Sequence, residues 1–341
     1  MGVPLIELTD DGLYCAAGGF HIDPWRPVDR AVVTHAHSDH ARWGSRTYLA
    51  AAPGEHLLRT RLGDITLDTL PYGTAVEQNG VRVSFHPAGH VLGSAQVRVE
   101  HRGEVWVVSG DYKLDPDPTC APFESVRCHT FLTESTFGLP VYRWDTSDVL
   151  FAKVNHWWRA NRDAGKASIV YAYALGKAQR VMAGVDPSIG PIYTHGAIEK
   201  VTCAYRDSGV SLPPTEPVGE AARGGKKAWA GALVIAPPSA DGSPWARKFE
   251  PASAAFASGW MMVRGARRRR AVDRGFVLSD HADWPGLLRA IRETGATRVL
   301  ATHGFAAVLA RWLRDHGTDA DVVATRYGDE DELSAEKEGA S

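Results

Sequence analysis

The stretch Thr34–Ala41, "THAHSDHA", places three histidines and an aspartate within six consecutive positions. Imidazole and carboxylate groups are costly to bury unless a partner compensates them, and a divalent metal ion is a common partner. The apolar run 31–33 just before this stretch predicts a buried strand, so the polar groups fall where the strand ends and a loop opens. The stretch therefore predicts a metal site on loops that are held by a sheet.

The spacing inside the stretch divides the four groups into two pairs. Residues two apart in an extended segment point to the same side, which groups His35 with His37. Asp39 and His40 then point elsewhere, towards a second ion. Each ion would need further ligands from distant segments, and two ions would need a group that bridges them.

Three later segments offer such groups. His90 lies in the turn "PAGHVLGSA", Asp111 directly follows a strand in "VVSGDY", and His303 ends a strand in "VLATHGF". An aspartate bridges two ions through its two oxygens, which a histidine does not do, so Asp111 is the best bridging candidate.

The overall composition is that of a globular protein. With 341 residues and 44% hydrophobic content, the chain is long enough for two domains with cores of their own. Its formal net charge of −2 gives no overall attraction to nucleic acid, so an anionic partner must be held by local patches. The four cysteines form no C-x-x-C pair, which indicates reduced thiols. We find no secretory signal and no long apolar run, so we expect a cytoplasmic protein with no membrane partner and a disordered acidic tail over 328–341.

Two patterns of secondary structure alternate along the chain. Short strand-like runs dominate the first part, namely "LYCAAGGFHI", "RAVVT", "VRVSF", "AQVRVE" and "EVWVVSGD", and they predict a largely antiparallel sheet. From about Thr146, helical patterns such as "DVLFAKVNHWWRANRDAG" alternate with buried strands such as "ASIVYAY", as in β-α units around a parallel sheet. After an Arg-rich loop, histidines again follow strands. We therefore expect a discontinuous core over 1–145 and 276–327, with a second domain inserted over 146–275.

The order of several motifs resembles that of a known family. The motifs "THAHSDHA", "AGHVLGS", "SGDY", "TEST", "SDHAD" and "ATHGF" resemble those of the metallo-β-lactamase-fold nucleases with a β-CASP insertion, over nearly the whole chain. Stretches such as "AAGGFHIDPWRP", "YALGKAQR" and "AFASGWM" are most similar to the bacterial ligase-associated DNA exonucleases, which also carry the name mRNA 3′-end processing factors. The resemblance implies an α/β fold, with a metallo-β-lactamase αββα sandwich and an inserted α/β β-CASP domain. It also implies a functional link to a DNA ligase and a helicase.

The resemblance implies a ligand set for two divalent ions. The first ion would be held by His35, His37 and His90, and the second by Asp39, His40 and His303, with Asp111 between them. Asp23, in "FHIDP", would orient ligands from behind, and an Asp-Pro turn is the alternative. Zinc suits a histidine-rich site best, although mixed His/Asp ligands also accept manganese or iron.

Glu134, in "LTESTFG", and His281, in "LSDHAD", match the two remaining motifs of the family. A carboxylate hydrogen-bonded to an imidazole keeps the ring oriented and favours its protonated form, so the pair would deliver a proton to the leaving oxygen. Together with Asp39 they form the expected catalytic set. Asp280 and Asp283, near His281, are expected to cap a helix start.

Three segments offer groups that would contact nucleic acid. An Arg-rich loop suits phosphate through bidentate donors, with a solvated loop as the alternative; its arginines are Arg264, Arg267, Arg268, Arg269 and Arg270. Lys177 and Arg180, in "YALGKAQR", lie at an expected strand-to-helix turn, where free N–H groups favour an anion. Ser258 and Gly259, in "FASGWM", lie at another strand end, beside the Trp260 ring that would stack on a base.

Together these features predict a two-metal nuclease that hydrolyses phosphodiester bonds at DNA ends, an exonuclease for end processing in DNA repair. An RNA-processing nuclease is the main alternative. RNA-processing members of the family have histidine at the last motif, as this chain does at His303, whereas DNA-cleaving members of the Artemis type usually have an apolar residue there. A non-catalytic nucleic-acid-binding subunit is a further alternative, against which the complete ligand set argues. A lactamase or glyoxalase type of hydrolase is disfavoured by the inserted domain and the arginine cluster.

Overall fold

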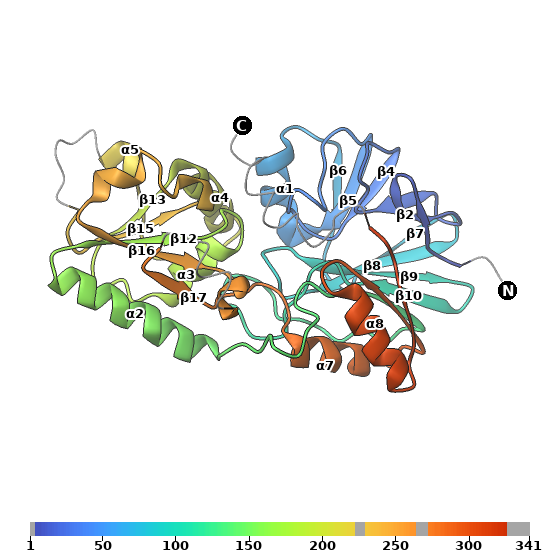
Figure 1. Cartoon of the computed structure of the whole chain (residues 1–341). Helices are drawn as coiled ribbons and strands as arrows, with labels where there is room; N and C mark the ends of the chain where they lie inside the picture. The colour runs from blue at the N-terminus through green and yellow to red at the C-terminus, as the bar shows by residue number, and fades with distance from the viewer. Residues whose placement is uncertain (1–3, 222–228, 264–271, 326–341) are drawn as a thin grey trace. The chain divides into compact units, whose positions relative to one another are not determined.

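The computed structural model describes residues 4–221, 229–263 and 272–325. The chain divides into two compact units, coloured mainly blue, cyan and red in one case and green to orange in the other (Figure 1). The first unit contains the described residues up to Arg143 and those from His281 onward, and the second runs from Trp144 to Asp280. The described strands form three sheets, two in the first unit and one in the second.

The first sheet has six strands in chain order. They are β1 (Glu7–Thr9), β2 (Gly12–Cys15), β3 (Phe20–Ile22), β4 (Arg30–Val33), β5 (Thr47–Ala51) and β6 (Leu67–Leu70), with η1 (Ala52–Gly54) and α1 (Glu55–Leu62) between the last two. The pairs β1–β2 and β2–β3 are antiparallel, whereas β3 to β6 pair in parallel. The expectation of a largely antiparallel sheet is therefore wrong here, because the chain crosses over between these strands instead of turning back through hairpins.

The second sheet has seven strands in the order β19-β18-β11-β10-β9-β8-β7. Their bounds are β7 (Ala75–Gln78), β8 (Val81–Pro87), β9 (Ala95–His101), β10 (Glu104–Val108), β11 (Thr130–Glu134), β18 (Arg298–Thr302) and β19 (Asp319–Val322). β7 to β10 form the antiparallel part that the sequence predicts. β10, β11, β18 and β19 pair in parallel, so a strand from the end of the chain lies directly beside β11.

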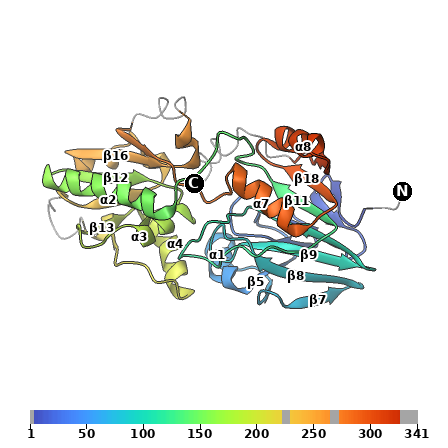
Figure 2. The same cartoon turned by 90° about the horizontal axis from the view of Figure 1, so that it is seen from below.

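Two apolar clusters hold the first unit together. One contains residues of both sheets, such as Phe20 and Val32 from the first and Val97 and Leu132 from the second. The other packs the second sheet against α7 (Trp284–Thr294) and α8 (Ala306–Asp315), which lie side by side in both views (Figures 1 and 2). The unit is thus two sheets that share one core, with two helices on the far face of the second sheet.

The second unit is built around a six-stranded sheet in the order β14-β13-β15-β12-β16-β17, in which every pair is parallel. Its strands are β12 (Ala167–Tyr171), β13 (Ile192–Thr194), β14 (Glu216–Pro217), β15 (Leu233–Ala236), β16 (Ala252–Ala257) and β17 (Arg274–Phe276). Its helices are α2 (Ser147–Asp163), α3 (Lys177–Gly184), α4 (Gly196–Asp207) and α5 (Val218–Ala221), with the short η3 (Pro238–Ala240), η4 (Ala246–Phe249) and η5 (Gly259–Met262). The parallel sheet agrees with the β-α pattern of the sequence.

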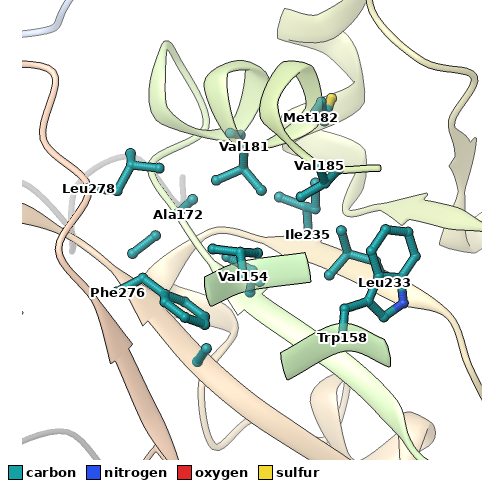
Figure 3. Packing of buried hydrophobic residues seen from close by; sticks show 14 of the residues in the cluster. Val154, Trp158, Ala172, Val181, Met182, Val185, Leu233, Ile235, Phe276 and Leu278 are labelled. Atoms are coloured by element: carbon teal, nitrogen blue, oxygen red, sulfur yellow. The ribbon is translucent and has the colours of Figure 1, made fainter. Parts of the chain in front are cut away.

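The core of the second unit joins its helices to the sheet (Figure 3). Trp158 of α2 and Met182 of α3 pack in one cluster with Leu233 of β15. β17 pairs with β16, and this unit runs to Asp280. None of the helices in the described ranges combines the length and the apolar character needed to cross a membrane.

Candidate metal centre

Strand ends bring the expected ligands towards one another. β4 runs directly into Thr34, whose carbonyl oxygen accepts a 2.8 Å hydrogen bond from the first residue of β9 and so ties the ligand loop to the second sheet. In that sheet β11 and β18 pair in parallel register up to Glu134 and Thr302. Carboxyl ends of adjacent parallel strands meet at the same edge of a sheet. Asp111 and His303, which follow β10 and β18, are delivered to this edge.

The first group of donor atoms consists of three imidazoles and one carboxylate, from His35, His37, His90 and Asp111. His37 Nδ1 lies 3.1 Å from His35 Nε2 and 3.0 Å from His90 Nε2. Asp111 Oδ2 lies 3.4 Å from His35 Nε2 and 3.8 Å from His90 Nε2. Nitrogen ligands at about 2.0–2.1 Å from a tetrahedral zinc ion stand roughly 3.3 Å apart, so this spacing fits one ion held by the four groups.

The Asp111 carboxylate also belongs to a second group, formed with Asp39 and His40. His40 Nε2 lies 3.4 Å from Asp111 Oδ2 and 3.5 Å from Asp39 Oδ2. This nitrogen is buried, and it has no hydrogen-bond partner among the described residues. A buried nitrogen that faces two carboxylates without a hydrogen bond fits a ligand of a second divalent ion.

His303 lies beside this second group without joining it. Its ring stacks on that of His40, with centroids 5.5 Å apart and 28° between the planes, and its buried Nδ1 has no hydrogen-bond partner in the described part of the chain. His303 has φ 54° and Asp23 φ 46°, in the left-handed region that non-glycine residues rarely adopt. The other described non-glycine residues of this kind, Asn79 and Arg102, lie in turns. Backbone strain of this kind concentrates at functional sites, which fits both residues at the centre.

The crowding of charges favours the ionised forms of Asp111 and His40. Burial alone would raise the pKa of Asp111, but the imidazoles of His40 and His281 hold it well below its usual value. Burial alone would lower the pKa of His40, but Asp111 and two neighbouring aspartates raise it well above its usual value. Burial, followed by the charge of His40, holds the pKa of His35 well below its usual value. His35 is therefore neutral and ready to bind an ion, whereas His40 must release a proton to do so.

Asp23 lies behind the second group and contacts the ligand loop with both of its oxygens. Its Oδ2 lies 2.7 Å from His40 Nδ1 and accepts a 2.6 Å hydrogen bond from the Thr34 hydroxyl, while its Oδ1 accepts from the Thr34 N–H at 2.8 Å. The carboxylate thus faces the ligands instead of closing an Asp-Pro turn on itself. Sequence reasoning missed Thr34, although its place directly before the first histidine was a signal.

Glu134 and His281 form a hydrogen-bonded pair beside these groups. His281 Nδ1 lies 3.0 and 3.1 Å from the two carboxylate oxygens, and Glu134 Oε1 also accepts a 2.7 Å hydrogen bond from the N–H of Tyr112. The His281 ring lies against that of His90, with centroids 4.7 Å apart. Since Asp111, Glu134 and His281 together are also close enough to hold an ion, the pair is placed either to move a proton or to act as ligands.

The two aspartates near His281 make different contacts. Asp283 caps α7 by accepting a 2.9 Å hydrogen bond from the N–H of Gly286, as expected. Asp280 lies in the second unit and faces Lys177 Nζ and Arg180 Nη1, each at 3.6 Å. The expectation that Asp280 is a helix cap is wrong, because these buried cations in the first turn of α3 require a carboxylate.

Those of the expected nucleic-acid-binding residues that lie in the described ranges are buried. Lys177 and Arg180 are buried and pair with Asp280, so a phosphate would have to compete with that carboxylate. Ser258 and Gly259 are also buried, and the Ser258 hydroxyl accepts from the N–H that follows Gly259, where it caps η5. The remaining arginines, Arg264, Arg267, Arg268, Arg269 and Arg270, lie outside the described residues.

An exposed tryptophan follows the ligand loop. The Trp43 side chain is 72% exposed, and it comes three positions after His40. Its loop is held in place by the Tyr48 hydroxyl, which donates to the Arg42 carbonyl at 2.7 Å and accepts from the Ser45 N–H at 2.9 Å. This loop presents a large aromatic ring to solvent, and the Trp43 backbone lies within about 11 Å of the His40 backbone, the reach of three residues. Sequence reasoning did not single out this residue, because tryptophan is abundant in the chain.

Comparison with known proteins gives relatives with a DNA ligase name and relatives with ribonuclease names. No family model matches the chain. A protein of Opitutus terrae named Probable DNA ligase is 33% identical over 314 residues, which cover 91% of this chain and 30% of that protein. Endoribonuclease YSH1 of Eremothecium gossypii is 30% identical over 122 residues, covering 35% of this chain and 16% of the relative. An RNase J-like protein of Methanocaldococcus jannaschii is 23% identical over 212 residues, covering 53% of this chain and 50% of that protein.

The chain is a relative of the β-CASP nucleases of the metallo-β-lactamase family. It spans half or less of the length of each of these three relatives. A crystal structure of a protein of unknown function from Enterococcus faecalis V583 has a similar fold, with a TM-score of 0.61 at 10% identity over 87% of this chain and 79% of that one.

Proposed function

We propose that the chain is a two-metal phosphodiesterase that removes nucleotides from DNA ends. The observation that carries the proposal is a single carboxylate, that of Asp111, shared by two groups of histidine and aspartate donors. Two-metal sites with ions about 3.5–4 Å apart recur in phosphatases and nucleases, where they act on phosphoryl oxygens. The relatives named as an endoribonuclease and as an RNase J-like protein support a metal-dependent hydrolase that acts on nucleic acid.

The family relationship supports a specific interpretation of the fold. The first unit, with two sheets on a shared core and α7 and α8 outside, would be the metallo-β-lactamase αββα sandwich. The second unit, with its parallel sheet, would be the β-CASP domain, inserted between Arg143 and His281. The proposed ligands and the Glu134–His281 pair then come from the two parts of the chain that flank the insertion.

The donor atoms fit two divalent ions. The first would be held by His35, His37 and His90, and the second by Asp39, His40 and His303, with Asp111 between them. Zinc suits this histidine-rich set best, and manganese is the alternative. When bound, the two ions would supply the positive charge that polarises a phosphodiester and activates water for its hydrolysis. Asp39 would take part in catalysis as one of these ligands.

Glu134 and His281 would move the proton that the leaving oxygen needs. The Tyr112 N–H donates to the Glu134 carboxylate, and that carboxylate contacts His281 Nδ1, so Nε2 would be the imidazole atom that faces the substrate. The negative charge of Glu134 favours the protonated imidazole before the reaction. His281 would give its Nε2 proton to the departing sugar oxygen and leave the phosphate on the other product.

DNA is the proposed substrate because the relative that aligns over 91% of this chain is named Probable DNA ligase. A ligase seals ends, and a nuclease that is similar to one of its segments would prepare them. RNA is the second candidate, supported by relatives with ribonuclease names that align over shorter segments.

Three groups outside the metal centre are candidates for contact with the strand. Trp43, exposed on its fixed loop, would stack on a base near the bond that is cut, since its backbone lies within about 11 Å of the His40 backbone. The Arg-rich loop would hold phosphates. Lys177 and Arg180 would bind a phosphate only by giving up Asp280.

Oligonucleotides of one sequence, made as DNA and as RNA and labelled at either end, test this function. The protein would be stripped of metal with a chelator, dialysed, and reloaded with Zn²⁺ or Mn²⁺. We expect stepwise shortening of DNA from one end only after metal is restored, and no cleavage by an Asp111→Asn control. Faster cleavage of RNA would replace DNA as the substrate, and inactivity on both polymers with two ions bound would refute the nuclease.

A further inference from the structure

A hydrogen-bonded group behind the metal centre links one ligand of each ion. Its centre is the Thr34 hydroxyl, whose oxygen lies 2.6 Å from Asp23 Oδ2 and 3.0 Å from His35 Nδ1. The same Asp23 oxygen lies 2.7 Å from His40 Nδ1. His35 belongs to the first donor group and His40 to the second, so one hydroxyl and one carboxylate touch both groups from the side away from Asp111.

The chemistry of these atoms decides where the protons lie. A carboxylate only accepts, so both the Thr34 hydroxyl and His40 Nδ1 must donate to Asp23. The Thr34 hydroxyl has one hydrogen, and it donates this hydrogen to Asp23, which is the nearer partner at 2.6 Å. The hydroxyl oxygen can therefore only accept a hydrogen bond from His35, at 3.0 Å. His35 must therefore carry its proton on Nδ1. In both rings Nε2 is the atom that faces Asp111 Oδ2, at 3.4 Å in each case, and in the neutral His35 ring the proton on Nδ1 leaves Nε2 without one.

We propose that Thr34 is a positioning residue that fixes the His35 tautomer, so that Nε2 is bare before an ion arrives. The proposal rests on the proposed metal centre and extends it, because it names what prepares the first ligand. Asp23 prepares His40 directly, and it prepares His35 only through Thr34. Removing the hydroxyl should therefore affect the ion that His35 holds and spare the other, whereas altering Asp23 should affect both.

The backbone around this group leaves the hydroxyl little freedom. Thr34 is buried, and its N–H donates to Asp23 Oδ1 at 2.8 Å, so the carboxylate grips both its backbone and its side chain. A Cβ on Gly110 would come within 2.7 Å of Thr34 Oγ1, so only glycine allows the chain before Asp111 to pass so close. Asp23 itself has φ 46°, a conformation that is costly for a residue with a side chain and that aims the carboxylate at the loop.

Two substitutions at Thr34 separate the hydroxyl from the shape of the side chain. Thr34→Val keeps the branched side chain and removes the hydroxyl, whereas Thr34→Ser keeps the hydroxyl and is the matched control. The two zinc dissociation constants of each protein would be measured by competition with a chromophoric chelator, and Asp23→Asn would be measured alongside. Groups that orient metal ligands typically change metal affinity by about 10–100-fold. We expect that loss for one of the two ions in Thr34→Val, wild-type affinities in Thr34→Ser, and losses for both ions in Asp23→Asn.

A second measurement observes the tautomer of His35 directly. In metal-free wild-type protein with ¹⁵N-labelled histidine, long-range ¹H–¹⁵N spectra report which nitrogen of each neutral ring carries the proton. We expect the His35 proton on Nδ1, and in Thr34→Val a population with that proton on Nε2. A wild-type proton on Nε2, or unchanged zinc affinities in Thr34→Val even if the variant is less stable, would overturn the proposal. Neither readout involves nucleic acid, so a protein that shows this pattern but cuts no strand would refute the nuclease and leave the role of Thr34 standing.

Discussion

The substitution Glu134→Gln tests the division of labour between ligands and proton donor. The introduced amide would have nearly the shape of the carboxylate, and its single carbonyl oxygen can still accept from the N–H of Tyr112 and from His281 Nδ1, both of which contact Oε1 in the wild type. What the substitution removes is the negative charge behind the imidazole. The geometry of the pair should therefore survive while its readiness to hold a proton falls.

The size of the effect follows from the kind of hydrogen bond that is lost. A hydrogen bond to a charged group contributes about 1.5–3 kcal/mol and a neutral one about 0.5–1.5, so the charge is worth about 1–1.5 kcal/mol. Since about 1.4 kcal/mol is tenfold in rate, we expect kcat to fall roughly tenfold in Glu134→Gln. His281→Ala removes the proton donor altogether and should lower kcat by about 10²–10⁴-fold. Because Glu134 acts through His281, the double variant should be no slower than His281→Ala alone.

The assay has two parts for the wild type and the three variants. Single-turnover cleavage of an end-labelled DNA strand gives the rate of the chemical step, and mass spectrometry of the dialysed protein gives the zinc content. We expect two zinc ions in every variant. Loss of an ion on His281→Ala would mean that His281 is a ligand, as its closeness to Asp111 allows, and losses that multiply in the double variant would mean that Glu134 does not act through His281.

Three further predictions concern other parts of the molecule. Burial raises the pKa of the Cys128 thiol from 9.0 to about 11, so at pH 8 its thiolate fraction is about 100-fold below that of an ordinary thiol. Alkylation followed by peptide mapping should therefore label the exposed Cys203 before Cys128. Equal labelling rates for the two cysteines would contradict this. Trp158→Ala should lower the free energy of unfolding of the second unit, measured by urea titration, by about 3–5 kcal/mol while both zinc ions stay bound. Trp158→Phe is the milder control. Loss of zinc in Trp158→Ala would show that the two units do not hold their structures separately. Trp43→Ala should raise KM for single strands roughly 5–150-fold and leave kcat unchanged, because stacking of one base contributes about 1–3 kcal/mol. Trp43→Phe should keep most of the binding. An unchanged KM in Trp43→Ala would exclude stacking.

The loop of proposed ligands can be recognised in the sequence because its information is local. The pattern predicts a buried strand and, directly after it, four candidate donors: His35, His37, Asp39 and His40. Their spacing alone divides the four into one pair for each ion. The antiparallel hairpins of β7 to β10 are equally local, since alternation and turn residues define them. The parallel pairing of β3 to β6 could not be predicted in this way, because the sequence of a short strand does not indicate which strand will pair with it after a crossover.

The contacts that sequence reasoning missed are those between groups far apart in the chain. Asp280 looks like a cap beside a helix start, and only the fold brings it against Lys177 and Arg180, which the sequence presented as free cations. Thr34 is inconspicuous beside the histidines until the structure shows its hydroxyl donating a hydrogen bond to Asp23. These roles depend on which buried charge lies nearest, and that is decided by packing.

The most direct test of the two-metal centre is an anomalous difference map at the zinc edge from crystals of the zinc-loaded protein. We expect two peaks about 3.5–4 Å apart. One should lie about 2.0–2.2 Å from His35 Nε2, His37 Nδ1 and His90 Nε2, and the other at similar distances from Asp39, His40 and His303, with the Asp111 carboxylate between them. Meeting that expectation requires the His303 ring to move closer to the second group than it lies here. A single peak, or a peak held by Glu134 and His281, would contradict the account.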